Sequence, residues 1–218
     1  MRRLVLLRPD PGASASLARA RALGLDTVAT PLFAVEPIAW AVPPLDAFDA
    51  LLLTSANALR HGGAGIGALA GLPVIAVGEA TAAEARAAGL TVTDVGYGGI
   101  DAALALVPPA QRLLHLSGAD RFAATTTHRV TAIAVYHARE IPDPRLPDLA
   151  EAVVAVHSAR AGARLADVVA DRGATMIAAI SAAAAAACGS GWESVATADA
   201  PSDTALLALA ARLCQDRA

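Results

Sequence analysis

The chain has 218 residues, which suits one large domain or two lobes of about 100 residues each. Its net charge of −3 offers no basic surface for nucleic acid. All 17 basic residues are arginines, which excludes a Walker-type phosphate loop and a Schiff-base lysine, and no apolar run approaches the ~20 residues that span a bilayer.

The N-terminal part of the sequence predicts the beginning of an α/β fold. A strand over residues 3–7 is followed by a polar turn, a helix over 13–23 and a second strand over 28–35. The apolar run of the first strand is too short for the core of a signal peptide. We therefore expect a cytoplasmic protein in which Cys188 and Cys214 are reduced core thiols.

Two proline-rich segments, 31–44 and 137–147, each follow a predicted strand. The strand before the second segment is predicted over 129–136. Both segments are interpreted as extended linkers at equivalent places in the chain. The helix expected over 119–128 is short and rich in threonine, which predicts a shrunken or irregular element there.

The segment 50–60, ALLLTSANALR, predicts a buried strand that ends at a polar turn and continues as a helix. The first turn of a helix has unpaired N–H groups and a positive dipole end, so such a turn favours an anion. The alternative is an ordinary capped helix without a ligand.

The same strand-turn-helix pattern returns further along the chain. Ser158 takes the place of Ser55, and Val195 takes the place of Val92, both at an offset of 103 positions. Strand-turn-helix units that recur in the same order at one offset indicate an internal duplication. The sequence therefore predicts two similar α/β lobes.

Other sequence features limit the kinds of ligand site that the chain can contain. Gly65, Gly67 and Ala70 spell G-x-G-x-x-A, but they follow a predicted helix instead of a strand, so a nucleotide-dependent enzyme is the weakest interpretation. The histidines are scattered without metal-ligand spacing, so we expect no metal site. What remains is a site without cofactors, made from backbone amides, hydroxyl groups and arginines.

Taken in order, these segments resemble the uroporphyrinogen-III synthase family over nearly the whole chain. The motifs that carry the resemblance are LLRPDPGASASLARARALG, PLFAVEP, DALLLTSANALR, AVGEATAAEARAAG, LHLSG, VYHAR and PSDTALLALAARL. The resemblance implies an α/β fold of two similar parallel-sheet lobes, joined by a two-stranded linker with the cleft between them. It further implies one discontinuous lobe over 1–34 and 140–218, an inserted lobe over 41–131, and paired linkers at 35–40 and 132–139.

The resemblance also implies an activity. Members of the family are cyclising hydro-lyases that close hydroxymethylbilane, an open tetrapyrrole with eight carboxylates, while inverting ring D and losing water. The product is uroporphyrinogen III, an intermediate of tetrapyrrole (heme and cobalamin) biosynthesis. Loss of the hydroxymethyl hydroxyl gives an azafulvenium, which closes through a spiro intermediate.

The family's functional residues transfer to matching positions of this chain. By this resemblance, Tyr136 is the linker tyrosine near the leaving hydroxyl and a candidate acid; the alternative is a tyrosine that only packs the linker. The substrate-binding positions implied by the motifs are Arg8, Thr54, Ser55, Ala56, Asn57, Gly78, Thr81, Ser158, Ala159, Arg160 and Ser181.

Some positions differ from the family's usual pattern. Ser181 and Ala183 stand where glycine and threonine are usual, and Ser117 replaces a frequent arginine. The alternative function is therefore a non-catalytic two-lobed binding protein for an anionic small molecule. On either interpretation we expect a monomer whose partner is a small polycarboxylate, with no nucleic acid and no membrane partner.

Overall fold

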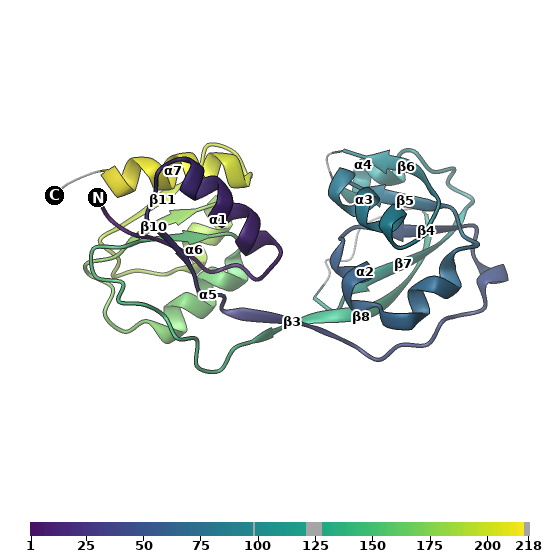
Figure 1. Ribbon diagram of the computed structural model, residues 1–218, viewed down its shortest axis with the longest axis horizontal. Helices are drawn as coiled ribbons and strands as arrows, with labels where there is room; N and C mark the ends of the chain where they lie inside the picture. The colour runs from purple at the N-terminus through teal and green to yellow at the C-terminus, as the bar shows by residue number, and fades with distance from the viewer. Residues whose placement is uncertain (98, 121–127, 216–218) are drawn as a thin grey trace. The chain divides into compact units, whose positions relative to one another are not determined.

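The computed structural model describes residues 1–97, 99–120 and 128–215. The chain divides into two compact units (Figure 1). Unit 1 comprises Met1–Ala34 and Glu140–Ala218, and unit 2 comprises Val35–Arg139. Each unit is built on its own sheet with helices packed on it, so the predicted α/β class is confirmed.

Sheet A, in unit 1, is parallel throughout. Within the described residues its strand order is β11-β10-β9-β1-β2. Leu4 of β1 pairs with Thr27 on one side and with Val153 on the other, so the first strand of the chain lies beside a strand from its second half. The strands are β1 (Leu4–Leu6), β2 (Thr27–Ala29), β9 (Val153–Val156), β10 (Met176–Ala179) and β11 (Ser194–Thr197).

Helices cover both faces of sheet A (Figure 1). On one face, α1 (Gly12–Ala22) and α7 (Asp203–Gln215) lie side by side and share a core cluster with β1 and β9. On the other face, α5 (Ala159–Val168) and α6 (Ala182–Ala187) pack against each other. This is the layered arrangement expected when both faces of a parallel sheet are buried.

Sheet B is the sheet of unit 2 and is mixed. Its order in the described part of the chain is β3-β8-β7-β4-β5-β6. The neighbours from β8 to β6 are parallel. The strands are β3 (Phe33–Pro37), β4 (Ala50–Leu53), β5 (Val74–Val77), β6 (Val92–Gly96), β7 (Arg112–Gly118) and β8 (Arg129–Glu140).

The edge strand β3 makes sheet B mixed, whereas the sequence predicted parallel sheets. Ile38 N donates to Val135 O at 2.9 Å, and Ile141 N donates to Leu32 O at 2.9 Å. The residue numbers rise along one partner as they fall along the other, so β3 runs antiparallel to β8.

The helices of unit 2 also lie on two faces. The helices α2 (Asn57–His61), η2 (Gly63–Leu69) and α3 (Glu79–Ala87) belong to one core cluster, and α4 (Ile100–Leu104) belongs to another. Leu51 and Leu53 point into the first cluster, and Ala50 and Leu52 point into the second. A short 3-10 helix, η1 (Leu45–Ala47), precedes β4.

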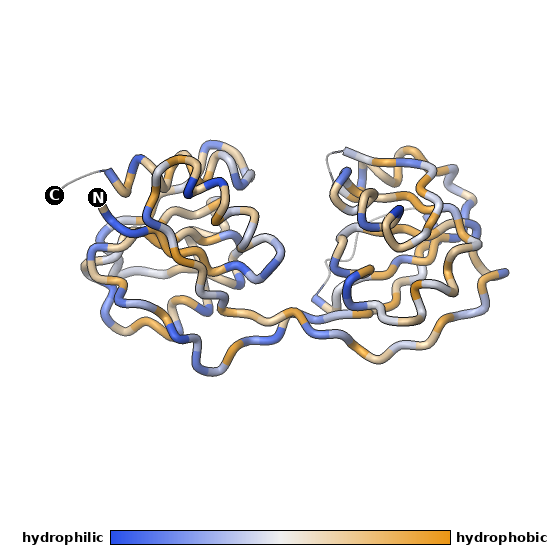
Figure 2. Tube along the Cα trace, in the orientation of Figure 1, coloured by the Kyte–Doolittle hydropathy of each residue, from blue (hydrophilic) through white to orange (hydrophobic). Residues whose placement is uncertain are grey.

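The central strands are buried along their whole length. Every residue of β1, β4 and β9 is at most 2% exposed. Figure 2 shows these strands as hydrophobic segments in the interior of each unit. The prediction of a buried strand at the start of 50–60 is therefore confirmed, and the continuous apolar run reflects burial on both faces.

The second predicted strand, 28–35, is wrong as a single element. β2 ends at Ala29, and a separate strand begins at Phe33. Pro31 lies between them and has no backbone N–H to donate to a strand ladder. The proline-rich segment 31–44 is accordingly part strand and not linker alone.

The strand predicted over 129–136 continues to Glu140 and takes in the first residues of the second proline-rich segment. Ala132, Ile133, Ala134 and Tyr136 pair with β7 inside sheet B, with a register shift before Tyr136. Most of the segment 119–128, predicted to be irregular, lies outside the described residues.

The glycine cluster after α2 forms the 3-10 helix η2. Gly65 has a packing role, since a Cβ built there would lie 2.6 Å from the Trp40 ring. Trp40 Nε1 donates to Gly62 O at 2.8 Å and fixes the indole against this helix. The Trp40 ring therefore leaves no room for a side chain at Gly65.

The close approach of α5 and α6 generates a stability prediction. A Cβ at Gly162 would lie 2.8 Å from Ala184 O and 3.0 Å from Cys188 Sγ. Gly162→Leu should lower the free energy of unfolding in urea by about 3 kcal/mol, because overpacking costs about 1–3 kcal/mol and a backbone oxygen cannot move aside. Ala163→Leu, on the exposed side of the same helix, is the control and should change it by less than about 0.5 kcal/mol. Equal stability of the two variants would contradict the close packing.

The buried thiols generate a second prediction. Burial raises the pKa of Cys188 and of Cys214 to about 11. At pH 8 only about one thiol in a thousand is ionised at that pKa, and the thiolate is the reactive form. Alkylation of the native protein by iodoacetamide should be at least about 100-fold slower than alkylation in urea, as followed by mass spectrometry. Rapid alkylation of either cysteine in the native protein would contradict the burial of that thiol.

Candidate functional site

The candidate site residues gather at the carboxyl ends of the parallel strands in each unit. The buried strands carry apolar side chains, and polar residues begin where each strand ends. Helices that follow parallel strands present their N-terminal N–H groups at this edge, which is the usual ligand-binding edge of such sheets. Each unit therefore has its own set of polar turns.

In unit 1, the turn between β9 and α5 is built by Ser158. Its backbone is extended (φ −162°), and its Oγ accepts a hydrogen bond from Ala161 N at 3.1 Å. Ala159 and Arg160 are the first two residues of α5, so their N–H groups belong to the unpaired first turn. The Arg160 guanidinium lies 4.5 Å from the centroid of the Phe33 ring, in a cation–π contact.

A second capped turn of unit 1 lies between β10 and α6. Ser181 has an extended backbone, and its Oγ accepts from Ala184 N at 3.2 Å. The following helix consists of alanines alone, so the polar groups of this turn are the serine and the backbone amides. A substrate-binding role was predicted from the sequence for Ser181, but this cap was not predicted.

Arg8 lies just beyond β1 at the same edge of unit 1. Its Nη1 donates to Ser16 Oγ and to Asp203 Oδ1, both at 3.3 Å. Asp203 is the first residue of α7. His157, the residue after β9, places Nε2 2.8 Å from Asp203 Oδ1. A site role was predicted from the sequence for Arg8 but not for Ser16, His157 or Asp203.

The charges of this network are set by burial and hydrogen bonding. Burial of His157 lowers the pKa of its imidazole, although the hydrogen bond to Asp203 opposes the shift. The imidazole is therefore neutral near pH 7, and Nε2 carries the proton because a carboxylate only accepts. Burial of Asp203 alone would raise the pKa of its carboxyl, but donors led by Ser16 and His157 outweigh burial and lower it.

In unit 2, the turn after β4 contains Thr54, Ser55, Ala56 and Asn57. Asn57 N donates to Ser55 Oγ at 3.2 Å, and Thr54 Oγ1 lies 3.0 Å from Nε2 of the buried His115. The helix α2 that follows has five residues and ends at His61, in agreement with the helix predicted up to residue 60. Its dipole is correspondingly small, so the local hydroxyls and amides provide most of the polarity of this turn.

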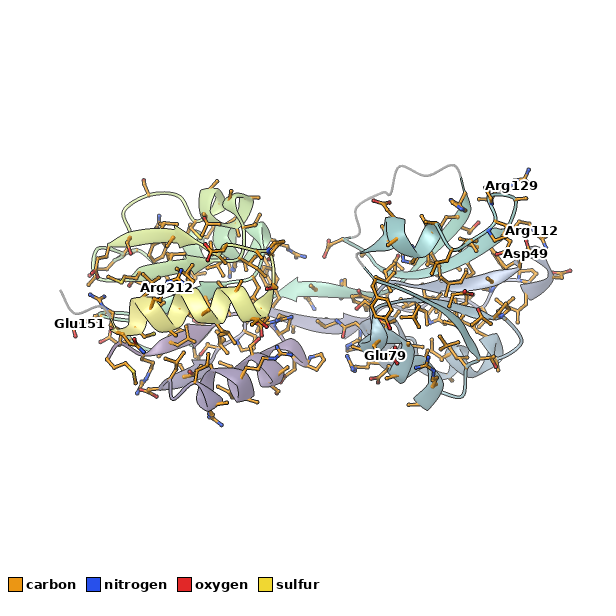
Figure 3. The ribbon with its side chains drawn as sticks, turned by 90° about the horizontal axis from the view of Figure 1, so that it is seen from above. Asp49, Glu79, Arg112, Arg129, Glu151 and Arg212 are labelled. Carbon is orange, nitrogen blue, oxygen red and sulfur yellow. The ribbon has the colours of Figure 1, made fainter. Side chains whose placement is uncertain are left out.

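Gly78 forms the third predicted turn, between β5 and α3. Its φ of +80° lies in the left-handed region that favours glycine, and its N–H donates to Gly96 O at 2.9 Å. Thr81 is 5% exposed in the first turns of α3. Glu79, labelled in Figure 3, occupies the first position of the helix and is bound by Arg86 at 2.7 Å.

Tyr136 lies in β8, at the other side of sheet B from the Gly78 turn. Its carbonyl oxygen accepts from Ala119 N at 2.9 Å. Its ring lies against Gly118, where a Cβ would be 2.9 Å from the ring, and 6.1 Å from the centroid of the His61 ring. The side chain is half-buried, so one side of the phenol is packed while solvent still reaches it.

The structure thus groups the predicted residues by unit. Arg8, Ser158, Ala159, Arg160 and Ser181 belong to turns of unit 1, and Thr54 to Asn57, Gly78, Thr81 and Tyr136 belong to unit 2. The Asp203 and His115 contacts were missed. A helix cap and a strand histidine carry no sequence signal for contacts across more than 40 positions.

Metal binding and membrane spanning can both be checked against the described residues. Among residues 1–97, 99–120 and 128–215, no group of three or more histidine, cysteine, aspartate or glutamate residues could hold a metal ion. Within these same ranges, no helix is both long and apolar enough to cross a membrane.

Comparison with known proteins identifies the family. The model of the HEM4 family, described as uroporphyrinogen-III synthase HemD, matches residues 14–208. The uroporphyrinogen-III synthetase of Helicobacter pylori 26695 is similar in structure, with a TM-score of 0.70 and 16% sequence identity, and the match covers 98% of this chain and 100% of that one. A mutant uroporphyrinogen III synthase of Thermus thermophilus has a TM-score of 0.56 and 20% identity, with complete coverage of both chains. No curated protein sequence matches the chain.

At these identities the two solved structures show a shared fold, while the family match rests on the sequence itself. That match spans most of the chain, from the helix after the first strand to the last helix. The chain therefore belongs to the uroporphyrinogen-III synthase family.

Proposed function

We propose that this chain is an active uroporphyrinogen-III synthase, a cyclising lyase that requires no cofactor. It closes hydroxymethylbilane with inversion of ring D and loss of water, and so forms uroporphyrinogen III for tetrapyrrole biosynthesis. The observation that carries the proposal is the family match over residues 14–208. The polar turns of both units support it, because a substrate with eight carboxylates needs many anion-binding groups.

The substrate's carboxylates bind, in this proposal, to the turns that follow the parallel strands. Ser158 and Ser181 hold their turns in the extended geometry that leaves the first amides of α5 and α6 unpaired. Arg160 adds a guanidinium next to the first of these turns. In unit 2, the Ser55 and Gly78 turns supply amides and hydroxyls.

Tyr136 acts as the acid in the proposed reaction. As the hydroxymethyl C–O bond breaks, its phenol proton moves to the departing oxygen and water leaves, which gives the azafulvenium. The substituted carbon of ring D attacks the exocyclic carbon to form the spiro intermediate, which fragments and closes again in the inverted sense. The proton released when the final pyrrole regains aromaticity returns to the phenolate, so no net acid is consumed. The contacts with Gly118 and His61 fix the ring for this role.

We also propose that the two units arose by internal duplication. Without its edge strand β3, sheet B has the order β6-β5-β4-β7-β8, and sheet A has the order β11-β10-β9-β1-β2. Each strand of one sheet thus has a counterpart at the same place in the other, and the sequence offset applies to β4, β5 and β6 against β9, β10 and β11. The lobes are then residues 1–34 with 140–218 and residues 41–131, connected through the paired segments 35–40 and 132–139, the second of which also extends sheet B through Ala132, Ile133, Ala134 and Tyr136.

Tyr136→Phe tests the proposed acid. The variant should form the type III isomer more slowly by about ten-fold or more, an effect near or below the roughly 100-fold lower limit for a positioned acid, because the azafulvenium forms readily. Substrate binding should change by less than about three-fold. The measurement is chromatographic separation of type III from type I product after addition of hydroxymethylbilane.

Tyr97→Phe is the matched control, since Tyr97 is an exposed tyrosine of the same unit. It should retain the wild-type rate. A normal rate for Tyr136→Phe would reduce Tyr136 to a packing residue. If the wild-type protein itself gives only the type I isomer, which forms spontaneously, the binding-protein function is favoured instead.

The Ser55 turn generates a further prediction. Ser55→Ala removes a hydroxyl that caps Asn57 N, whereas Ser55→Pro also removes a backbone N–H and restrains the turn. If backbone amides bind carboxylates, the proline variant should bind the substrate about ten-fold more weakly than the alanine variant, the effect of one hydrogen bond to a charged group. Isothermal titration of both variants, after circular dichroism has shown that they are folded, gives the comparison. Equal affinities would exclude the amides of this turn as ligands.

A further inference from the structure

A single carboxylate connects four segments of unit 1. Asp203 Oδ1 accepts from Ser16 Oγ at 2.6 Å, from His157 Nε2 at 2.8 Å and from Arg8 Nη1 at 3.3 Å. Asp203 Oδ2 accepts from Arg19 Nη1 at 2.5 Å. These donors come from the ends of β1 and β9 and from α1, and the acceptor begins α7.

The network is well enclosed. Ser16 is fully buried, and the side chains of His157 and Asp203 are 9% and 14% exposed. A carboxylate with this many donors is held in place and has little capacity left for a ligand. Its function in the network is therefore to orient its donors.

The network carries a positive charge overall. Arg8 and Arg19 contribute two charges, Asp203 removes one, and His157 is neutral because burial lowers the pKa of its imidazole. The remaining charge favours an anion at the edge of the sheet, whereas the N-terminus of α1 is already occupied by Asp10, whose Oδ1 accepts from Ser14 N at 2.9 Å.

Arg8 is the member of the network that can reach a ligand. Its guanidinium lies against Gly12, where a Cβ would come within 2.3 Å of Nε, so the glycine makes the room that the side chain occupies. Both of its hydrogen bonds to the described residues are donated by Nη1. Nη2 and Nε remain for an acceptor, and the side chain is 33% exposed. A guanidinium fixed at one nitrogen can bind a carboxylate with the others at a reduced entropic cost.

We propose that Asp203 is the positioning residue of a carboxylate subsite centred on Arg8, and that it also fixes the turn before α5 through His157. The inference rests on the proposed function, because the carboxylate it binds is one of those of the tetrapyrrole substrate. Asp203 itself touches no reacting atom. Its effect is on the orientation of Arg8 and on the His157–Ser158 turn.

A double-mutant cycle tests the proposal. Asp203→Asn and Arg8→Gln should each raise KM about ten-fold and leave kcat within about three-fold, since the contact holds the substrate equally before and during reaction. The double variant should raise KM by clearly less than the product of the two single effects, because Asp203 acts in part through Arg8 and in part through the His157–Ser158 turn. Asp26→Asn, which breaks the exposed ion pair with Arg3 in the same unit, is the control and should leave KM unchanged.

Three results would overturn the proposal: an unchanged KM for Asp203→Asn, a loss confined to kcat, or effects of the two substitutions that multiply. If Asp203→Asn does not fold, Ser16→Ala replaces it, with an expected rise in KM of about three-fold.

If the wild-type protein forms no type III isomer, the proposed function fails, and the subsite is tested by titration with uroporphyrin, a stable octacarboxylate. Its affinity should then fall in Arg8→Gln and in Asp203→Asn alike, and an unchanged affinity would reject the subsite.

Discussion

The burial of β1, β4 and β9 on both faces is the constraint from which the rest of the structure follows. A strand covered by helices on both sides has no place for a polar side chain without a partner, so these strands carry aliphatic residues alone. Polar groups are therefore confined to the turns at the strand ends. Parallel pairing then brings those turns to one edge of each sheet, which is why positions far apart in the sequence supply neighbouring anion-binding groups.

In each unit, the residue that follows a buried central strand makes a polar contact, but the chemical groups in contact differ. In unit 1, the residue after β9 is His157, and it meets a carboxylate that also binds two arginines. In unit 2, the residue after β4 is Thr54, and its hydroxyl meets the imidazole of His115. At the first junction, arginines are available to bind a carboxylate ligand. At the second junction, hydroxyls and backbone amides would bind it instead. Turns at corresponding places in the two sheets can therefore bind the same class of ligand with unequal strength.

How much the sequence predicts depends on the range of the contacts involved. The strand at Ala50–Leu53 and the strand-turn-helix junction at Ser158 follow from local patterns, and the structure contains both. The break at Pro31 was missed because apolar residues continue on both sides of it. The Asp203 network could not be predicted, since its members lie up to 195 positions apart and each has an ordinary local explanation.

The pairing of Leu4 with Val153 has a consequence for synthesis on the ribosome. The first strand of unit 1 emerges early but has no partner β9 until most of the chain has been translated. Unit 2 is continuous from Val35 to Arg139 and can complete its own sheet in the meantime. The nascent chain must therefore keep an apolar strand and an arginine-rich helix soluble while the inserted unit folds. The alternating Ala and Arg residues of α1, with little apolar surface, suit that period of exposure.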